Sequence, residues 1–260
     1  MVKTINYHIQ TLPFSMHKGH PYTFEDGILM SKIPYNQGYH YHLTSIASYA
    51  IAEYPSRKSE RHIEWIIDNL NNGCYYHDFD VITYDNVKAP WVGGLAQGLA
   101  ISALMLYDEI NVAKKVAEGL KRECVVDDII QEYPGVTVLN GWIYAIFGLV
   151  DIFDTDFLHV TLKKLLYELP KYVNPNRPWS IYDSTGMPAT TFYHRVVFEQ
   201  LKILYALTKI DEFYDRSVMM FMMDNFSSRR FRDINRWIRI LWKNRKHPIR
   251  RYNEYRRWKE

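Results

Sequence analysis

The sequence predicts an all-α fold, specifically an α/α toroid: an incomplete α/α barrel of helical hairpins behind a short N-terminal segment that is β-rich or irregular. First, apolar residues recur with a helical period along nearly the whole chain after residue 40. Second, the connections alternate between short turns, which pair helices antiparallel, and long loops rich in Trp, Tyr and Pro, which would return to one rim. The same helices also fit an irregular bundle. The lack of a fixed-period repeat argues against a regular solenoid.

The elements follow in order along the chain. Residues 1–40 carry no helical period, and short strands are expected at 22–24 and 27–30. Helices are expected at 43–55, 59–71, 94–108, 111–123, 138–153, 156–168, 190–208, 212–225 and 230–246. We therefore predict three parts: an N-terminal segment over 1–40 on the rim of a cleft, a helical domain over 41–226, and a tail over 227–260.

Charge sets the C-terminal tail apart. The net charge of the 260 residues is +3, but residues 229–260 hold thirteen of the 32 Lys and Arg and three of the 29 Asp and Glu, a balance of +10. An apolar stripe at helical spacing runs through the tail, formed by Phe231, Ile234, Trp237, Ile238, Leu241 and Trp242. A basic amphipathic helix of this kind fits three roles: binding an anionic membrane surface, holding a polyanionic glycan, or packing its stripe on the domain. No base-reading motif is present, so no nucleic acid partner is expected.

Composition excludes several classes of protein. Two cysteines, Cys74 and Cys124, are too few for a disulfide framework and lack metal-ligand spacing. The N-terminus lacks the apolar core of a signal peptide, and no uncharged run approaches the roughly 18 residues of a spanning helix. We expect a cytoplasmic protein, either free or peripheral at the inner membrane surface. Neither a cofactor nor a metal is expected, because Gly93–Gly94 lacks phosphate-loop spacing and the histidines within 39–42 are two residues apart.

Three loops directly precede apolar helices. Glu132 and Tyr133 stand before a Pro–Gly break and the helix that follows. Residues 90–94 precede the helix after Leu95, and residues 179–183 precede the helix that contains Tyr193. Loops held by a rigid helical scaffold are where chemistry tends to sit, so these loops predict an active site.

The same three segments resemble the C-terminal domain of D-glucuronyl C5-epimerases, which convert glucuronate to iduronate within heparan-type polysaccharides. The resemblance covers about residues 39–225 and lies in PWVGGLAQGLAIS (90–102), QEYPGVTVLNGWIYAIFGLVDI (131–152), and SIYD (180–183) with YHRVVFEQL (193–201). It implies an α/α barrel and a cofactor-independent isomerase acting on an acidic polysaccharide or glycan. A homodimer is compatible with this interpretation.

The resemblance also implies site residues. It assigns catalytic roles to Glu132 of the EYP motif, Tyr182 of the IYD motif and Tyr193 of the YH motif, and Tyr133 and His194 match the pattern beside them. This chain departs from the family where residues 184–187 replace an arginine-bearing stretch, where Val197 replaces a second histidine and where Leu106 replaces a common arginine.

Epimerisation at C5 explains why these residue types are needed. Removing a proton α to a carboxylate requires donors or cations around that carboxylate, a proton acceptor on one face of the sugar and a donor on the other. Tyrosine can fill both roles, but its phenol pKa of about 10 must be lowered by a nearby cation or donor. Alternatively, Glu132 is the base and one tyrosine the acid. The expected substrate-binding residues are Trp91, Gly94, Gln97, Asn140, Arg177, Arg195, Tyr39 and His40. Packing is an equal alternative role for Trp91 and the favoured role for Asn140.

Two other functions stay open at this point. An α/α-barrel polysaccharide lyase or glycoside hydrolase would use similar residues, and Glu132 and Asp183 are the natural carboxylate pair for an inverting hydrolase. A catalytically degenerate homologue would bind a glycan or a membrane without turnover, and the missing arginines favour it.

Overall fold

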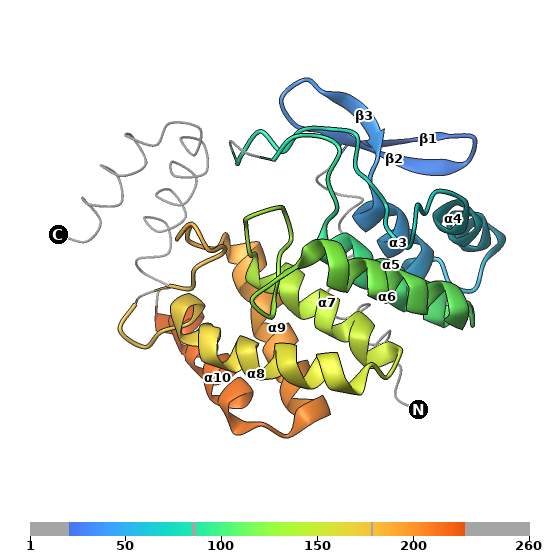
Figure 1. Ribbon diagram of the computed structural model, residues 1–260. Coiled ribbons are helices and arrows are strands. Elements are labelled where there is room, and N and C mark those ends of the chain that lie inside the picture. Colours follow the sequence, from blue (N-terminus) through green and yellow to red (C-terminus); the bar gives the residue numbers. More distant parts are fainter. Residues whose placement is uncertain (1–20, 85–86, 178, 227–260) are drawn as a thin grey trace. The chain divides into compact units, whose positions relative to one another are not determined.

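The computed structural model describes residues 21–84, 87–177 and 179–226 (Figure 1). The predicted helix at 230–246 and the basic tail lie outside these residues. The described residues form eight helices and five short strands and divide into two compact units. The first unit holds residues 21–80 and 87–167, and the second holds residues 81–84, 168–177 and 179–226. The predicted boundaries at 40/41 and 226/227 stay predictions.

A three-stranded antiparallel sheet opens the first unit. It consists of β1 (Tyr22–Glu25), β2 (Ile28–Ile33) and β3 (Gly38–Tyr41), in that order. The β1–β2 turn is formed by Asp26 and Gly27, both at positive φ, as a tight hairpin requires. Ile28, Leu29 and Ile33 of β2 are buried where this strand packs on α3 and α4. The two predicted strands are present, but β3 was not predicted.

Five helices lie wholly within the first unit (Figure 1). Their buried apolar residues form its core. They are α3 (Leu43–Ala52), α4 (Arg57–Asp68), α5 (Gly94–Leu106), α6 (Ile110–Cys124) and α7 (Leu139–Asp151). Helix α5 packs against α3, α6 and α7. Nearly every residue of α5 and α7 is buried, which explains their apolar sequences without a polar face.

Two glycines bring α5 and α7 close together. A Cβ atom added to Gly98 would lie 2.4 Å from the Cα of Ala145, and one added to Gly148 would lie 2.5 Å from the carbonyl oxygen of Gly98. Any larger side chain at either position would push the two backbones apart. A short hairpin of β4 (Val125–Val126) and β5 (Ile129–Ile130) then leads from α6 towards the loop before α7.

The second unit is built on a helical hairpin. Its helices are α9 (Thr191–Thr208), capped by the Thr190 side chain, and α10 (Asp211–Phe226), joined through Lys209 in the left-handed conformation. Helix α8 (Thr155–Tyr172) runs from the first unit into the second. It is longer than predicted because Pro170 lies in its last turn and does not end it.

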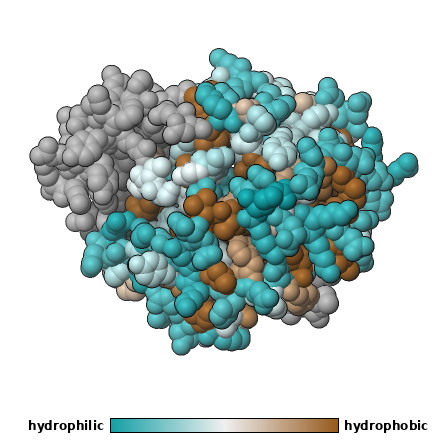
Figure 2. Space-filling view, in the orientation of Figure 1, coloured by the Kyte–Doolittle hydropathy of each residue, from teal (hydrophilic) through white to brown (hydrophobic). Residues whose placement is uncertain are grey.

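Eight of the nine predicted helices are therefore confirmed within a few residues, and the fold is mostly helical with a few short strands. No helix among the described residues is both long and apolar enough to span a membrane. Hydrophilic residues cover much of the face shown in Figure 2, with hydrophobic residues between them. Among the large side chains of the described residues, Tyr167 of α8 is 74% exposed.

Candidate functional site

The candidate residues Glu132 and Tyr133 of the first unit lie on a tight turn before α7. Tyr133 and Val136 pair through two backbone hydrogen bonds, and the backbone N–H of Glu132 also donates to the Val136 carbonyl. Pro134 and Gly135 fill the turn, and Gly135 has the positive φ of +78° that a type II turn requires at this position. The EYPG sequence thus fixes both candidate residues by local geometry.

The carboxylate of Glu132 is buried against the first turn of α7. Only 6% of the residue is exposed. A Cβ atom added to Gly141 would lie 2.1 Å from a carboxylate oxygen of Glu132, so the side chain occupies space that only a glycine leaves open. The positive end of the helix dipole favours a negative charge at this place.

Trp91 lies beneath this turn. Its ring contacts the ring of Tyr133 at a centroid distance of 5.2 Å, and its indole N–H donates to the Phe79 carbonyl at 2.7 Å. The backbone N–H of Gly94 donates to the Gln131 carbonyl at 3.0 Å, and a Cβ atom at Gly94 would lie 2.4 Å from that oxygen. Two of the three predicted loops therefore meet within the first unit. Trp91 is only 4% exposed, so its position suits support of the turn better than stacking on a sugar.

Gln97 and Asn140 are both buried. The amide of Gln97 donates to the Gly73 carbonyl and accepts from the Tyr75 N–H, which anchors the segment between α4 and α5. Asn140 lies in the first turn of α7, one residue before Gly141. The position of Gln97 suits a structural role.

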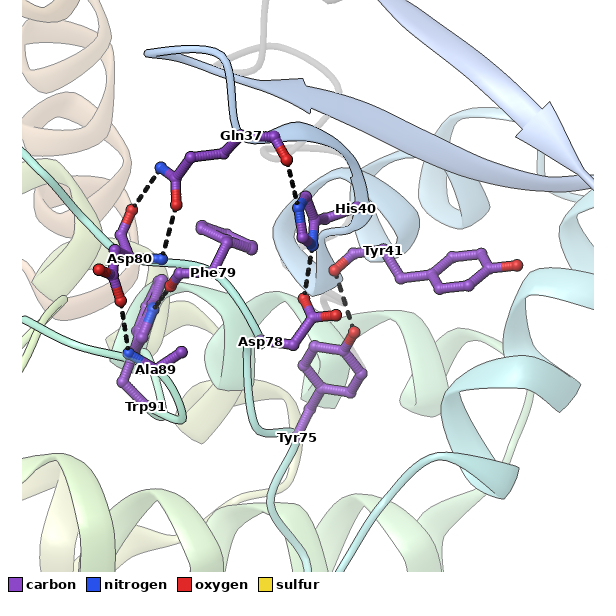
Figure 3. A network of polar contacts seen from close by, with 9 residues as sticks. All are labelled: Gln37, His40, Tyr41, Tyr75, Asp78, Phe79, Asp80, Ala89 and Trp91. Atoms are coloured by element: carbon purple, nitrogen blue, oxygen red, sulfur yellow. Dashed lines mark hydrogen bonds and ion pairs between the residues drawn. The ribbon is translucent and has the colours of Figure 1, made fainter.

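Tyr39 and His40 lie on β3, and Figure 3 shows the network around His40. One ring nitrogen of His40 faces the Asp78 carboxylate at 2.9 Å, and the other faces the Gln37 carbonyl at 2.8 Å. Burial lowers the pKa of His40, but the Gln37 carbonyl and the Asp78 carboxylate outweigh it, so the pKa is raised above its ordinary value. The Gln37 side chain also bridges the backbone N–H and carbonyl of Asp80. This network fastens the β2–β3 loop to the segment that leads to Trp91.

The second unit holds the two candidate tyrosines, which touch. The rings of Tyr182 and Tyr193 have centroids 4.6 Å apart and an interplanar angle of 44°. Tyr182 is 7% exposed, whereas Tyr193, in the first turn of α9, is partly exposed. Two phenols predicted from separate motifs therefore form one pair.

A carboxylate holds the turn that carries Tyr182. One oxygen of Asp183 accepts from the backbone N–H and hydroxyl of Thr185 and from the backbone N–H of Met187. The other oxygen accepts from the Tyr84 hydroxyl at 2.7 Å. Tyr84 stands 99 residues earlier in the chain, so no local sequence signal could have revealed this contact. Burial and the charges of Asp183 and Glu168 raise the pKa of the neighbouring Tyr172 well above its ordinary value.

His194 lies inside the second unit rather than on its surface. Its ring stacks on Trp179 with centroids 3.9 Å apart. Nε2 donates to the Met220 carbonyl at 3.1 Å, and Nδ1 lies 2.7 Å from the Ser180 hydroxyl. This histidine ties α9 to α10 and to the loop that carries Tyr182. Sequence reasoning did not identify Ser180 as its partner.

The two candidate arginines of the second unit differ in surroundings. Arg177 donates from its guanidinium to the Lys171 carbonyl at 2.8 Å and is partly exposed. Arg195 is exposed on α9. Among the described residues, no group of three His, Cys, Asp or Glu side chains is arranged to hold a metal ion.

The family model described as "D-glucuronyl C5-epimerase C-terminus" matches residues 68–222. The match includes the Trp91 loop, the Glu132 turn, the Asp183 turn and the tyrosine pair. No curated protein matches the chain. Since the family model covers more than half of the 260 residues, the chain belongs to the D-glucuronyl C5-epimerase C-terminal domain family.

Proposed function

We propose that this protein is a cofactor-independent uronate C5-epimerase that converts D-glucuronate to L-iduronate residues in a polysaccharide or glycan. The observation that carries the proposal is the match of residues 68–222 to the epimerase family, a range that contains Glu132, Tyr182 and Tyr193. Within the second unit, the rings of Tyr182 and Tyr193 lie beside each other with centroids 4.6 Å apart. The proposal includes an α/α toroid as the complete arrangement of the helical hairpins.

The proposed reaction exchanges one proton at C5. A base removes the proton α to the sugar carboxylate, and the resulting charge spreads onto that carboxylate. An acid then returns a proton from the opposite face, so atoms and charge balance without a redox step. Tyr182 and Tyr193 are the proposed pair, because one phenol can act while ionised and the other while neutral.

Glu132 is the alternative proton acceptor. Its carboxylate is buried in the first unit and held in one place by the turn and by Gly141. Tyr133 follows it in the same turn and contacts Trp91. We assign His194 a positioning role, since both of its ring nitrogens already contact Ser180 and Met220.

The hydrolase alternative is less well supported. Asp183 would be one of its two catalytic carboxylates, but this side chain accepts four hydrogen bonds within its own unit. A carboxylate committed in this way suits holding a turn better than activating water.

The proposed substrate is an acidic polysaccharide or glycan. Arg177, Arg195, Tyr39 and His40 are proposed contacts on it, and residues 229–260 are proposed to bind an anionic membrane surface. These assignments come from residue chemistry, and they are secondary to the proton-transfer pair.

Incubation of heparosan with the protein in D₂O tests the activity. We expect deuterium at C5 of the uronate without chain shortening, detected by mass spectrometry and NMR. Tyr182→Phe and Tyr193→Phe should each reduce incorporation by at least about a hundredfold, the lower range of general acid–base catalysis. Tyr167→Phe, at the exposed tyrosine of α8, is the matched control and should exchange like the wild type. Chain cleavage, or full exchange in both phenylalanine variants, would contradict the proposal.

A further inference from the structure

One side of α10 exposes an apolar surface that the proposed chemistry does not use. It consists of Tyr214, Val218, Phe221 and Met222, which are between 38% and 57% exposed. Residues three and four apart lie on the same side of a helix, so these four residues form a stripe, called here the α10 stripe. Helix α10 packs on α9, and Phe213, on a different side of α10, is fully buried. A contiguous exposed apolar surface usually marks an interface.

Two aromatic rings of α9 widen this surface. The ring centroid of Phe198 lies 6.2 Å from that of Phe221, and the ring centroid of Tyr205 lies 5.2 Å from that of Tyr214. Both α9 rings are partly exposed. The two contacts are seven residues apart on each helix, so the apolar surface follows the α9–α10 hairpin for about two helical turns. It is long enough to receive another helix.

The chain that follows α10 can return along this surface. Helix α10 ends at Phe226, and residues 227–260 follow it in the sequence but lie outside the described residues. The helix expected at 230–246 would begin only a few residues after α10. Short connections pair consecutive helices antiparallel, as the ring contacts show for α9 and α10.

An antiparallel return would bring two stripes of the same spacing opposite each other. The apolar stripe of the tail, at 231–242 and called here the tail stripe, has members four residues apart, as the α10 stripe has. A connection centred near residue 228 pairs them in reverse order: Met222 with Ile234, Val218 with Ile238, and Tyr214 with Trp242. Each stripe would then remove the apolar surface of the other from water.

Charge favours the same partner. Asp211 and Asp215 of α10 are exposed, and each lies one helical turn before a member of the α10 stripe. Residues 229–260 hold thirteen basic and three acidic residues, a balance of +10. A basic segment packed on α10 would lie beside these two carboxylates, which adds a modest attraction to the burial of apolar surface.

The basic side of the tail would stay outside such a contact. On a helix, Arg232, Arg236 and Arg239 lie on the side away from the tail stripe. They would remain in water and would still be available to an anionic surface. Insertion of the tail stripe into a membrane would instead leave the α10 stripe exposed, so docking on α10 accounts for both stripes at once.

We propose that the α10 stripe is the docking surface for the C-terminal tail of the same chain, whose stripe at 231–242 packs on it as an antiparallel helix. The inference does not depend on the epimerase activity. It implies that the tail is attracted to an anionic membrane through its outward-facing arginines and not through insertion of its apolar side.

Disulfide cross-linking in the full chain tests the proposed register. Val218→Cys/Ile238→Cys should form an intramolecular disulfide on mild oxidation with copper phenanthroline, detected as faster migration on a non-reducing gel. Val218→Cys/Arg236→Cys, whose second cysteine lies on the basic side, should cross-link at least about tenfold more slowly, because a disulfide requires Cα atoms within about 7 Å of each other. Cys74 and Cys124 are buried and stay in place in both variants.

A charge placed in the α10 stripe should release the tail. Val218→Arg should speed chymotrypsin cleavage at Trp237 and Trp242 at least about tenfold, because a guanidinium group opposes burial against apolar side chains and repels the basic tail. Val160→Arg, at a valine of α8 with similar exposure, is the matched control and should be cleaved like the wild type. Both valines are exposed, so circular dichroism should show that both variants stay folded.

Three results would overturn the inference. The first is an equal cross-linking rate in the two cysteine pairs, or equal cleavage of Val218→Arg and Val160→Arg. The second is a disulfide that forms only between two chains, which would make a second copy the occupant of the α10 stripe. The third is an absent cross-link together with quenching of tryptophan fluorescence by vesicles of phosphatidylserine and brominated phosphatidylcholine, which would make the membrane the partner of the tail stripe. None of these readouts involves C5 exchange, so this inference and the proposed function can fail separately.

Discussion

The carboxylate of Glu132 lies in the space that the missing side chain of Gly141 leaves open on α7, 2.1 Å from where a Cβ atom would be. Both residues belong to the motif at 131–152. The EYP turn positions the carboxylate, and Gly141, nine residues later on α7, leaves room for it. A substitution at Gly141 therefore tests the position of Glu132 without changing its chemistry.

Gly141→Ala should displace the Glu132 carboxylate. Alanine favours a helix over glycine by about 0.5–1 kcal/mol, but the overpacking cost of about 1–3 kcal/mol is larger. We expect a lower free energy of unfolding in urea and slower C5 exchange. The double variant Glu132→Ala/Gly141→Ala should be less destabilised than the two single changes together, because it removes the clash. Additive effects in this double-mutant cycle would show that the two residues do not compete for space.

Ser180→Ala should loosen the support of the tyrosine pair. It removes the partner of the buried His194 Nδ1, at 2.7 Å, and leaving a buried nitrogen unpaired costs about 1–3 kcal/mol. We expect a loss of stability in this range and a lower exchange rate, measured by denaturant unfolding and deuterium incorporation. Ser184→Ala, at an exposed residue of the neighbouring turn, is the control and should change neither quantity by much. If Ser180→Ala and Ser184→Ala had equal effects, the hydrogen bond between Ser180 and His194 would not be what positions the tyrosine pair.

The acid sensitivity of the fold should depend on His62. Burial is the main cause of its lowered pKa, and protonation would place a proton between Nε2 and the Leu29 N–H. The stability that His62 contributes is therefore present above its unfolded pKa of about 6.5 and is lost as the pH falls through its lower folded pKa. His62→Gln should be less stable at neutral pH and should show a smaller decrease between neutral and acid pH. Melting temperatures of the wild type and of His62→Gln, measured from pH 8 to pH 4, test this prediction. A parallel decrease in the two proteins would contradict it.

His40 should affect the pH dependence of stability in the direction opposite to that of His62. Its pKa is raised because the Gln37 carbonyl and the Asp78 carboxylate outweigh burial, so the stability from its charged form is fully present below about pH 6.5 and is lost as the pH rises through the folded pKa. Asp78 is 71% exposed at the side chain, so the effect should be small and should shrink in high salt. Asp78→Asn should remove most of the difference between pH 6 and pH 8 in the melting temperature. A variant that keeps the full difference would show that Asp78 is not the relevant partner.

The helices could be predicted from the sequence, whereas contacts between residues far apart in the chain could not. Apolar periodicity located α3 to α10 because each helix buries a continuous face. The hairpin of β4 and β5 was missed, although Asp127 and Asp128, both at positive φ between two apolar pairs, carry a recognisable turn signal. β3 was missed because its residues, including Tyr39, were interpreted as part of a rim.

The candidate site residues could likewise be predicted only in part. Motifs placed Tyr182 and Tyr193 on adjoining loop and helix, and the structure brings their rings into contact. Ser180 and Gly141 lie within or beside the same motifs, yet their roles depend on packing directions that a sequence does not contain.

Tyr84→Phe tests whether the distant clamp on Asp183 matters for the tyrosine pair. The phenol of Tyr84 supplies one of four hydrogen bonds to that carboxylate, and a bond to a charged group contributes about 1.5–3 kcal/mol. Three bonds remain, so we expect the protein to stay folded with a destabilisation at the low end of this range. Exchange should slow more than stability falls, because the Asp183 turn sets the backbone that carries Tyr182. Tyr214→Phe, at an exposed tyrosine of α10, is the matched control for loss of a phenol in the same unit. Wild-type exchange in Tyr84→Phe would mean that the local bonds from Thr185 and Met187 suffice to hold Tyr182 against Tyr193.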